Sequence, residues 1–327
     1  MKPTIIVYRE LPEPEKVRLQ SHFHIIEFKE LSSTDDPQFI EALNTAEGLI
    51  GAGLPLKADV LDKAPKLKAL STISVGTDAF DLNYLGKRGI PLMHTPTVLT
   101  ETTADTIFTL ILASARRAVE LDKFVRSGQW QSSIGPDLFG SNVHGKTLGI
   151  LGLGRIGSAV ARRAHHGFGM RIQYYNHSRK AEAEAEFDAR KMSLDELLRT
   201  SDFVCSVLPY VPETHHLIDE HAFAMMKESA FFINGGRGKT VDQAALVNAL
   251  EQNVIKGAGL DVFEQEPLPA DSPLMTLDNV VLLPHIGSAT HETRDAMARC
   301  AVDNLISALN GDISINCANQ SQLEVLV

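Results

Sequence analysis

The chain has 327 residues and a mass of 35.7 kDa, with 44% hydrophobic and 22% charged residues, enough for a substantial core and two domains. Its net charge of −10 argues against a nucleic-acid partner, and no apolar stretch resembles a signal peptide or reaches the length of a membrane-spanning helix. Three widely spaced cysteines, Cys205, Cys300 and Cys317, predict free thiols and a cytoplasmic location rather than a disulfide scaffold.

The first hundred residues alternate between short apolar runs and polar, helix-like stretches. The apolar runs predict strands at residues 5–8, 25–28, 48–50, 70–74 and 91–94. Strands that alternate with helices are typical of a parallel sheet. We therefore expect an α/β unit at the start of the chain.

A second alternation begins at Thr147 and predicts six stronger strands, at residues 147–151, 171–175, 203–207, 230–233, 257–260 and 280–283. Six strands of this kind fit a doubly wound parallel sheet. Between them, Ser193 and Glu196 match a capping box, and residues 180–187 predict an exposed helix.

Two helical segments, at residues 101–119 and 290–309, flank this second unit. We interpret both as connections across a domain boundary, so that the last helix returns to the first unit. The fold expected is α/β with two Rossmann-like domains. A doubly wound domain at 101–289 is inserted into a flavodoxin-like domain made of residues 1–100 and 290–327.

A glycine turn follows the first strand of the second unit. Residues 149–157 read GILGLGRIG, which places Gly152, Gly154 and Gly157 in the spacing GxGxxG where a buried strand runs into a helix. The glycines allow a tight turn and a close approach to a pyrophosphate, which the helix N-terminus binds. The motif alone is weak, but its position between strand and helix predicts a dinucleotide site that also includes Arg155 and Ile156.

The second strand of that unit ends at Asn176, about 20 residues beyond the glycines, where NAD enzymes usually carry a carboxylate. Asn176 lacks the negative charge that would repel a 2′-phosphate, and Ser178 and Arg179 add hydrogen bonds and positive charge. We predict NADP(H) as the cofactor, with NAD(H) used more weakly. The alternative is that Arg179 and Lys180 are solvated loop charges.

Polar residues follow the later strands, and in open α/β sheets ligands bind beyond the carboxyl ends of strands. Arg237 follows the Gly235-Gly236 pair, and an arginine fork suits the carboxylate and carbonyl of a 2-oxo acid. His285 is a candidate proton donor that Glu266 could hold in its charged form. Each alone could be structural, but together they predict an active site.

No metal site is expected. The adjacent histidines at 165–166 and 215–216 lack the ligand spacing of a zinc site, so we assign them structural roles.

Four further segments extend the pattern: residues 74–78 (SVGTD), 232–238 (FINGGRG), 259–267 (GLDVFEQEP) and 284–290 (PHIGSAT). With the glycine turn, they resemble the D-isomer-specific 2-hydroxyacid dehydrogenase family over most of the chain. Within that family the chain resembles in particular the bacterial glyoxylate/hydroxypyruvate reductases that also reduce 2-ketogluconate, through residues 94–101 (HTPTVLTE) and 288–294 (SATHETR).

The resemblance implies NADPH-dependent hydride transfer to small 2-oxo acids, giving D-2-hydroxy acids. His285 would be the proton donor, Glu266 its partner and Arg237 the substrate-binding arginine, with the backbone of Val75 and Gly76 on the substrate carboxylate. It implies cofactor contacts at the glycine turn and at further positions: Thr103, Arg155, Ile156, Asn176, Ser178, Arg179, Asp261 and Gly287. Leu208 and Pro209 are added as cofactor contacts because they end the third strand of the second unit.

Relatives often carry Ala or Ser at the position of Gly235, a departure that we expect to be harmless. Trp130 reads by default as a core aromatic. The corresponding region of the family joins a dimer contact, so we expect a homodimer.

Two other functions stay open. The chain could be a Rossmann protein that senses NAD(P)H and recruits partners, but such a protein needs no acid/base pair. It could also be a formate- or phosphite-type dehydrogenase, which the NADP-like strand end disfavours. The sequence does not rank glyoxylate, hydroxypyruvate and 2-ketogluconate.

Overall fold

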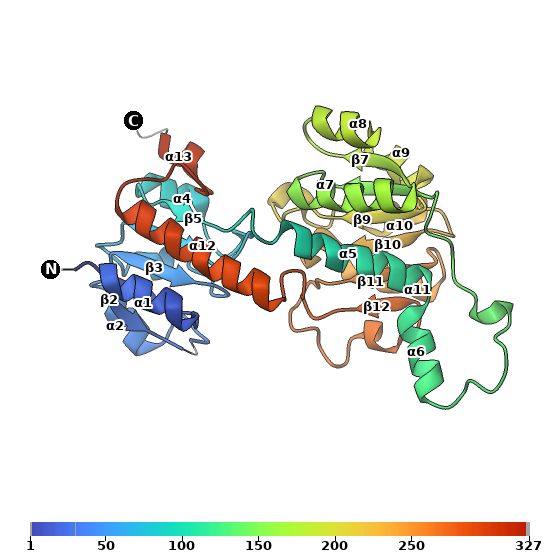
Figure 1. The fold of residues 1–327 in the computed structure, drawn as a ribbon, viewed down its shortest axis with the longest axis horizontal. Coiled ribbons are helices and arrows are strands. Elements are labelled where there is room, and N and C mark those ends of the chain that lie inside the picture. The colour runs from blue at the N-terminus through green and yellow to red at the C-terminus, as the bar shows by residue number, and fades with distance from the viewer. Residues whose placement is uncertain (1, 30, 325–327) are drawn as a thin grey trace. The chain divides into compact units, whose positions relative to one another are not determined.

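The computed structural model describes residues 2–29 and 31–324, and the chain divides into two compact units. The first unit comprises Met1–Leu99 and Ala289–Val327, and the second comprises Thr100–Ser288. Figure 1 shows the chain coloured from its N-terminus to its C-terminus.

The first unit contains, within its described residues, a parallel sheet of five strands in the order β2-β1-β3-β4-β5, here called the first sheet. The predicted strands are confirmed to within two residues at each end. The strands are β1 (Thr4–Val7), β2 (His24–Glu27), β3 (Gly48–Gly51), β4 (Ala69–Thr72) and β5 (Leu92–Met93).

Helices cover both faces of the first sheet. One face packs against α12 through Ala301 and Leu305, and the other against α2 and α3 through residues such as Phe39 and Leu61. The helix expected at 290–309 is confirmed, and the side chain of Thr290 caps it by accepting a hydrogen bond from Thr293 N–H. The helices are α1 (Glu13–His22), α2 (Pro37–Leu43), α3 (Ala58–Leu61), α4 (Leu82–Lys87), α12 (His291–Leu309) and α13 (Gln320–Glu324).

The second unit is built on a parallel sheet in the order β12-β11-β10-β9-β6-β7-β8, here called the second sheet, with seven strands among the described residues. Six of them confirm the predicted strands, and the expected number of six is wrong by one. The additional strand, β8, has two exposed residues and no apolar run that could reveal it. The strands are β6 (Thr147–Leu151), β7 (Arg171–Tyr175), β8 (Arg190–Lys191), β9 (Phe203–Ser206), β10 (Phe231–Asn234), β11 (Gly257–Leu260) and β12 (Val280–Leu282).

The second sheet is also covered on both faces. Buried side chains of α5, α7 and α8 pack on one face, and those of α9, α10 and α11 pack on the other (Figure 1). The capping box at Ser193 is confirmed. The helices are α5 (Thr100–Ala115), α6 (Ala118–Arg126), α7 (Arg155–Arg162), α8 (Ala181–Phe187), α9 (Leu194–Thr200), α10 (Glu220–Met225) and α11 (Gln243–Glu251).

Three local predictions need correction. The helix expected at 101–119 breaks after Ala115, because Arg117 takes a left-handed backbone conformation (φ 53°) and starts α6. Its guanidinium holds the break by donating to Glu120 Oε1 and Oε2 at 2.6 and 2.7 Å. Trp130 is 61% exposed and is not a core residue. The helix at 180–187 is confirmed, but its Phe187 is buried.

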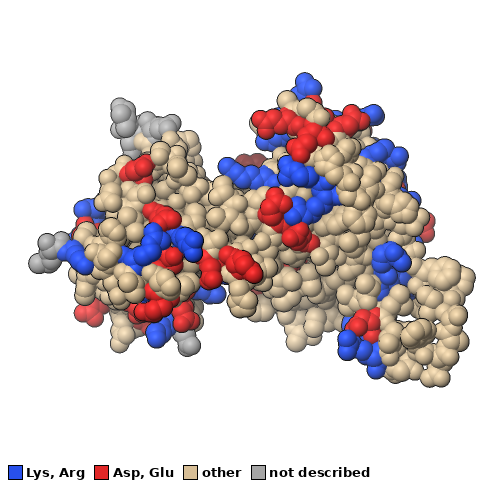
Figure 2. All heavy atoms as spheres, in the orientation of Figure 1, with Lys and Arg blue, Asp and Glu red and all other residues tan. Residues whose placement is uncertain are grey.

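The described residues contain no helix that is long and apolar enough to cross a membrane. The three cysteines, all of them described, carry free thiols. On the face drawn in Figure 2, basic and acidic side chains are mixed, with uncharged areas between them.

Candidate active site

The glycine turn lies at the carboxyl end of β6. Gly152 has φ +94°, and a side chain there would meet Val207 O at 3.0 Å. A Cβ at Gly157 would lie 2.4 Å from Gly152 O, so α7 packs directly on the turn. A Cβ at Gly154 would meet nothing within 4 Å, and none of the described side chains caps this helix. The turn therefore presents an open helix N-terminus, as a pyrophosphate site requires.

Asn176 follows β7, and its side-chain amide donates to Ser178 O at 3.1 Å and to Ser178 Oγ at 3.4 Å. The side chain of Arg179 is 74% exposed, and it also has a partner. Its guanidinium pairs with Glu184 of α8 at 2.6 Å, and Glu184 also accepts from Tyr174 Oη at 2.6 Å. The hydrogen bonds from Arg179 and then Tyr174 lower the pKa of Glu184. The predicted basic group is present, paired with a carboxylate.

His285 and Glu266 form a hydrogen-bonded pair, with 2.7 Å between His285 Nδ1 and Glu266 Oε2. The other carboxylate oxygen accepts from Phe263 N–H at 3.0 Å. Burial alone would raise the pKa of Glu266, but these two hydrogen bonds and the positive charges of His285 and Arg237 lower it. Glu266 is thus a carboxylate suited to stabilise a protonated His285. It binds His285 through Nδ1 and not through Nε2.

Arg237 follows β10 and is half-buried beside that pair. Its Nη1 donates to Gly236 O at 2.9 Å, and its charge is one of those that lower the pKa of Glu266. The charges of Arg237 and His285 therefore both act on Glu266. The three residues follow strands of the second sheet at their carboxyl ends, where the glycine turn also lies.

Asp261 shapes the loop that carries His285. Its two carboxylate oxygens accept from Ile286 N–H at 2.7 Å and Gly287 N–H at 2.9 Å. His285 itself has φ 53°, a left-handed conformation that is uncommon for a non-glycine residue. Burial raises the pKa of Asp261, while the two N–H groups oppose that shift. Its loop-holding role is one that the sequence did not reveal.

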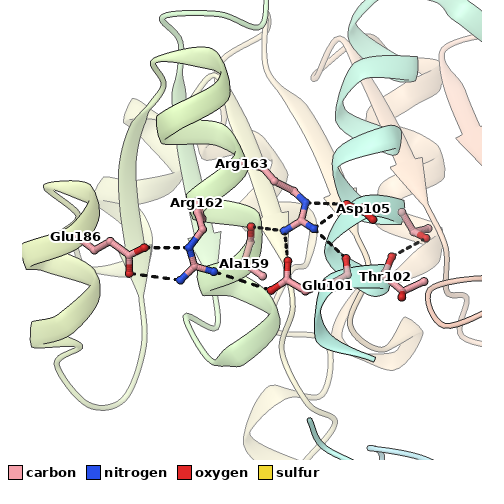
Figure 3. A network of polar contacts seen from close by, with 8 residues as sticks. Glu101, Thr102, Asp105, Ala159, Arg162, Arg163 and Glu186 are labelled. Carbon is pink, nitrogen blue, oxygen red and sulfur yellow. Dashed lines mark hydrogen bonds and ion pairs between the residues drawn. The ribbon is translucent and has the colours of Figure 1, made fainter. Parts of the chain in front are cut away.

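Thr103 lies in the first turn of α5 and is buried against the same loop, since a Cβ at Gly287 would be 3.2 Å from Thr103 Cγ2. Arg163 fixes this turn by pairing with Glu101 at 2.8 Å and Asp105 at 2.7 Å, while Arg162 joins α7 to Glu186 of α8. Figure 3 shows that these arginines link three helices. Thr103 therefore lies beside Gly287, in a turn whose Glu101 and Asp105 are paired with Arg163.

The remaining candidates lie at other strand ends. The side chain of Leu208 is buried beside Gly152, and its backbone runs against Gly236, whereas Pro209 is exposed. Arg155 is exposed and Ile156 is half-buried at the start of α7.

Val75 and Gly76 belong to the first unit, in the loop after β4. Gly76 N–H donates to Ser74 Oγ at 3.0 Å, and His94 Nδ1 lies 3.1 Å from Val75 O.

Among the described residues, no group of three or more His, Cys, Asp and Glu side chains could hold a metal ion. His165 and His166 lie in a π-helical turn, and the rings of His215 and His216 stack at 4.0 Å.

Comparison with known proteins agrees with this geometry. Residues 108–287 match the family model "D-isomer specific 2-hydroxyacid dehydrogenase, NAD binding domain". The chain is 56% identical to glyoxylate/hydroxypyruvate reductase B of Cronobacter sakazakii over 319 residues, 98% of each chain. It is 55% identical to the protein of that name from Yersinia enterocolitica over 324 residues, 99% of each chain.

Solved structures show the same similarity. The NADPH-dependent glyoxylate/hydroxypyruvate reductase of Sinorhizobium meliloti, in complex with NADP and malonate, superposes with a TM-score of 0.88 at 30% identity, covering 99% of this chain and 98% of that one. A protein of Thermus thermophilus superposes with a TM-score of 0.88 at 40% identity, covering 96% of this chain and 99% of that one.

Proposed function

The chain belongs to the D-isomer-specific 2-hydroxyacid dehydrogenase family, and on that premise we propose that it is an NADPH-dependent reductase of small 2-oxo acids. The substrates are glyoxylate, hydroxypyruvate and 2-ketogluconate, and the products are D-2-hydroxy acids. The names of its relatives support the first two substrates. The third rests on the resemblance of residues 94–101 and 288–294.

The observation that carries the proposal is the 2.7 Å pair of His285 and Glu266 beside the charge of Arg237. A protein that only senses a nucleotide needs the glycine turn but has no use for an acid/base pair. The pair and the turn share one edge of the second sheet, where open α/β sheets bind ligands.

The chemistry follows from the groups at this edge. When bound, the reduced nicotinamide supplies the hydride that adds to C2 of the oxo acid. His285 donates a proton to the carbonyl oxygen through Nε2, because Nδ1 is bonded to Glu266. Glu266 stabilises the imidazolium, and Arg237 binds the substrate carboxylate and polarises the carbonyl.

The glycine turn fits a dinucleotide, since Gly154 leaves open space above an uncapped helix N-terminus. We assign the 2′-phosphate of NADPH to Asn176, Ser178 and Arg179. The Arg179–Glu184 pair does not exclude this assignment, because Arg179 is exposed and a phosphate carries more charge than a carboxylate. The other proposed contacts with the cofactor are made by Thr103, Leu208, Pro209, Asp261 and Gly287.

A panel of initial rates tests this function. Oxidation of NADPH is measured with each of the three 2-oxo acids, with NADH as the paired control and the chirality of the product determined. We expect oxidation that depends on the oxo acid, faster with NADPH, giving the D-product. A clear NADH preference would refute the cofactor assignment. Reduction of NAD⁺ by formate or phosphite, with no response to oxo acids, would refute the reductase.

We also propose a homodimer built on α6 and the segment after it. This region projects from the second sheet (Figure 1), and residues 127–145 contain one Asp and no Lys or Arg. In Figure 2 the segment after α6 is drawn mostly in tan, whereas α6 itself carries charged side chains. Large apolar side chains that are exposed in this region favour an interface. They are Val119, Val125, Trp130, Ile134 and Phe139.

Sedimentation at micromolar concentration tests the dimer. The chain should sediment as twice its mass, and Trp130→Glu should release monomers, whereas Val17→Glu on α1, also at an exposed apolar position, should not. A 35.7 kDa species alone would refute the dimer.

A cytoplasmic location is supported by the three free thiols. Burial raises the pKa of the Cys205 thiol to about 12, which keeps it unreactive. Recovery of the protein in an extracytoplasmic fraction of its host would refute this location.

A further inference from the structure

A second histidine–carboxylate pair lies on the loops next to the first. Glu264 precedes Glu266 by two residues in the segment that follows β11, and its Oε1 lies 2.6 Å from Nε2 of His216. His216 comes from the segment between β9 and α10 and has φ 49°, a left-handed conformation. Two loops from different strands therefore meet at Glu264.

Glu264 is also bonded to α11. Gln243, the first residue of that helix, donates its backbone N–H to Glu264 Oε1 at 3.2 Å. In return, the side-chain oxygen of Gln243 accepts from Glu264 N–H at 3.3 Å. The side chain and backbone of Glu264 are thus both held, and the carboxylate joins the loop of Glu266 to a helix terminus and to His216.

The backbone at Glu264 runs against the loop that carries Arg237. A Cβ at Gly238 would lie 1.8 Å from Phe263 O and 2.5 Å from Glu264 N, so only glycine fits beside Arg237. The peptide of Phe263 in turn donates its N–H to Glu266 Oε1 at 3.0 Å. Any shift of residues 263–264 therefore moves the hydrogen bond that orients the Glu266 carboxylate.

We propose that Glu264 and His216 are a positioning pair. The pair fixes residues 263–266 and thereby keeps Glu266 and His285 correctly placed relative to Arg237. The inference rests on the proposed reductase function. Neither residue touches the reacting atoms. The pair acts through the Phe263 peptide, and a misplacement of about 1 Å at a catalytic group can lower a rate on the order of 100-fold.

The test compares Glu264→Ala, Glu264→Gln and His216→Asn in the full chain, with NADPH and hydroxypyruvate. Glutamine can still accept from Gln243 N–H and donate to His216, and asparagine tolerates the left-handed backbone at 216. Gln265→Ala is the matched control, because Gln265 is exposed on the same loop and none of the described residues bonds to its side chain.

We expect Glu264→Ala to lower kcat roughly 10- to 100-fold with an unchanged NADPH dissociation constant. The primary isotope effect on kcat, measured with NADPH deuterated at the transferred position, should rise because hydride transfer becomes rate-limiting. Glu264→Gln should recover most of kcat, His216→Asn should fall between the two, and Gln265→Ala should match the wild type.

A purely structural ion pair would give a lower melting temperature with kcat and isotope effect unchanged, and that result would overturn the proposal. If Glu264→Ala does not fold, the same criteria apply to His216→Asn. If the wild type is active and Glu264→Ala and His216→Asn have the same kcat as the wild type, the positioning pair alone is refuted. If the wild type shows no oxo-acid-dependent oxidation of NADPH, the reductase and this inference are refuted together.

Discussion

Two carboxylates at the carboxyl ends of the strands accept hydrogen bonds from main-chain N–H groups. Asp261 holds the loop of His285 through the N–H groups of Ile286 and Gly287, and Glu266 is held by the N–H of Phe263. The residue types after each strand were sufficient to predict Arg237, Glu266 and His285 as candidates. The orienting role of Asp261 could not be predicted, because it depends on where the next strand's loop lies.

Glu184 should tune cofactor preference, because it pairs with Arg179 at 2.6 Å. The change Glu184→Gln removes the competing carboxylate but can still accept from Tyr174. We expect the KM for NADPH to fall roughly two- to fivefold, the range of an exposed ion pair, with the KM for NADH unchanged.

Steady-state kinetics with both cofactors measure this effect. Glu182→Gln on the same helix is the control, since Glu182 is exposed and the described residues form no ion pair with it. Equal changes for NADPH and NADH would contradict a role at the 2′-phosphate.

At the scale of elements, the sequence predicted what depends on local pattern. Strands with buried apolar runs were located to within one or two residues, and the capping box at Ser193 was found. The missed features depend on tertiary contacts. Strand β8 is too short and polar to show a pattern, and the break at Arg117 depends on bonds to Glu120.

The environment of Gly235 also depends on a tertiary contact that the sequence does not show, because α5 lies directly against this glycine. A Cβ at 235 would lie 2.4 Å from Ile107 Cγ1. We expect Gly235→Ala to lower the free energy of unfolding by about 1–3 kcal/mol through overpacking.

A double-mutant cycle measured by urea unfolding isolates this contact. In the Ile107→Ala background, which lacks the colliding atoms, Gly235→Ala should cost less than about 0.5 kcal/mol. Equal costs in both backgrounds would show that Ile107 does not impose the glycine.

Asp202 ties the amino ends of the second sheet together, accepting from Thr147 N–H at 2.9 Å and pairing with Lys227 at 2.8 Å. Burial alone would raise the pKa of Asp202, but Lys227 and Thr147 outweigh it and the pKa is lowered. A carboxyl whose pKa is depressed by folding stabilises the fold above its unfolded pKa, near ~3.9, and loses that effect as pH falls.

Asp202→Asn should therefore lower stability by about 1 kcal/mol at pH 7, and the difference from the wild type should shrink as the pH falls below about 4. Urea midpoints of both proteins across this pH range measure it. A difference that stays constant down to the lowest pH at which both fold would contradict the role of the charge.

On the scale of the whole molecule, the chain leaves its first unit at residue 99 and returns at residue 289. Two separate alternations of strand and helix, with helices between them, are visible in the sequence and predict this interrupted order. The surface that we propose for the homodimer could not be predicted from a local sequence pattern. Trp130 reads as a core residue from its type alone, and only the structure shows that it is exposed with its apolar neighbours.

We propose that His285, held by Glu266 and accompanied by Arg237, makes this chain a 2-oxo acid reductase. The most direct measurement compares wild type and His285→Ala for hydroxypyruvate-dependent NADPH oxidation, with NADPH binding followed by fluorescence. We predict turnover in the wild type and a loss on the order of 100- to 10,000-fold in the variant, with binding retained. Near-normal turnover in His285→Ala would contradict the account.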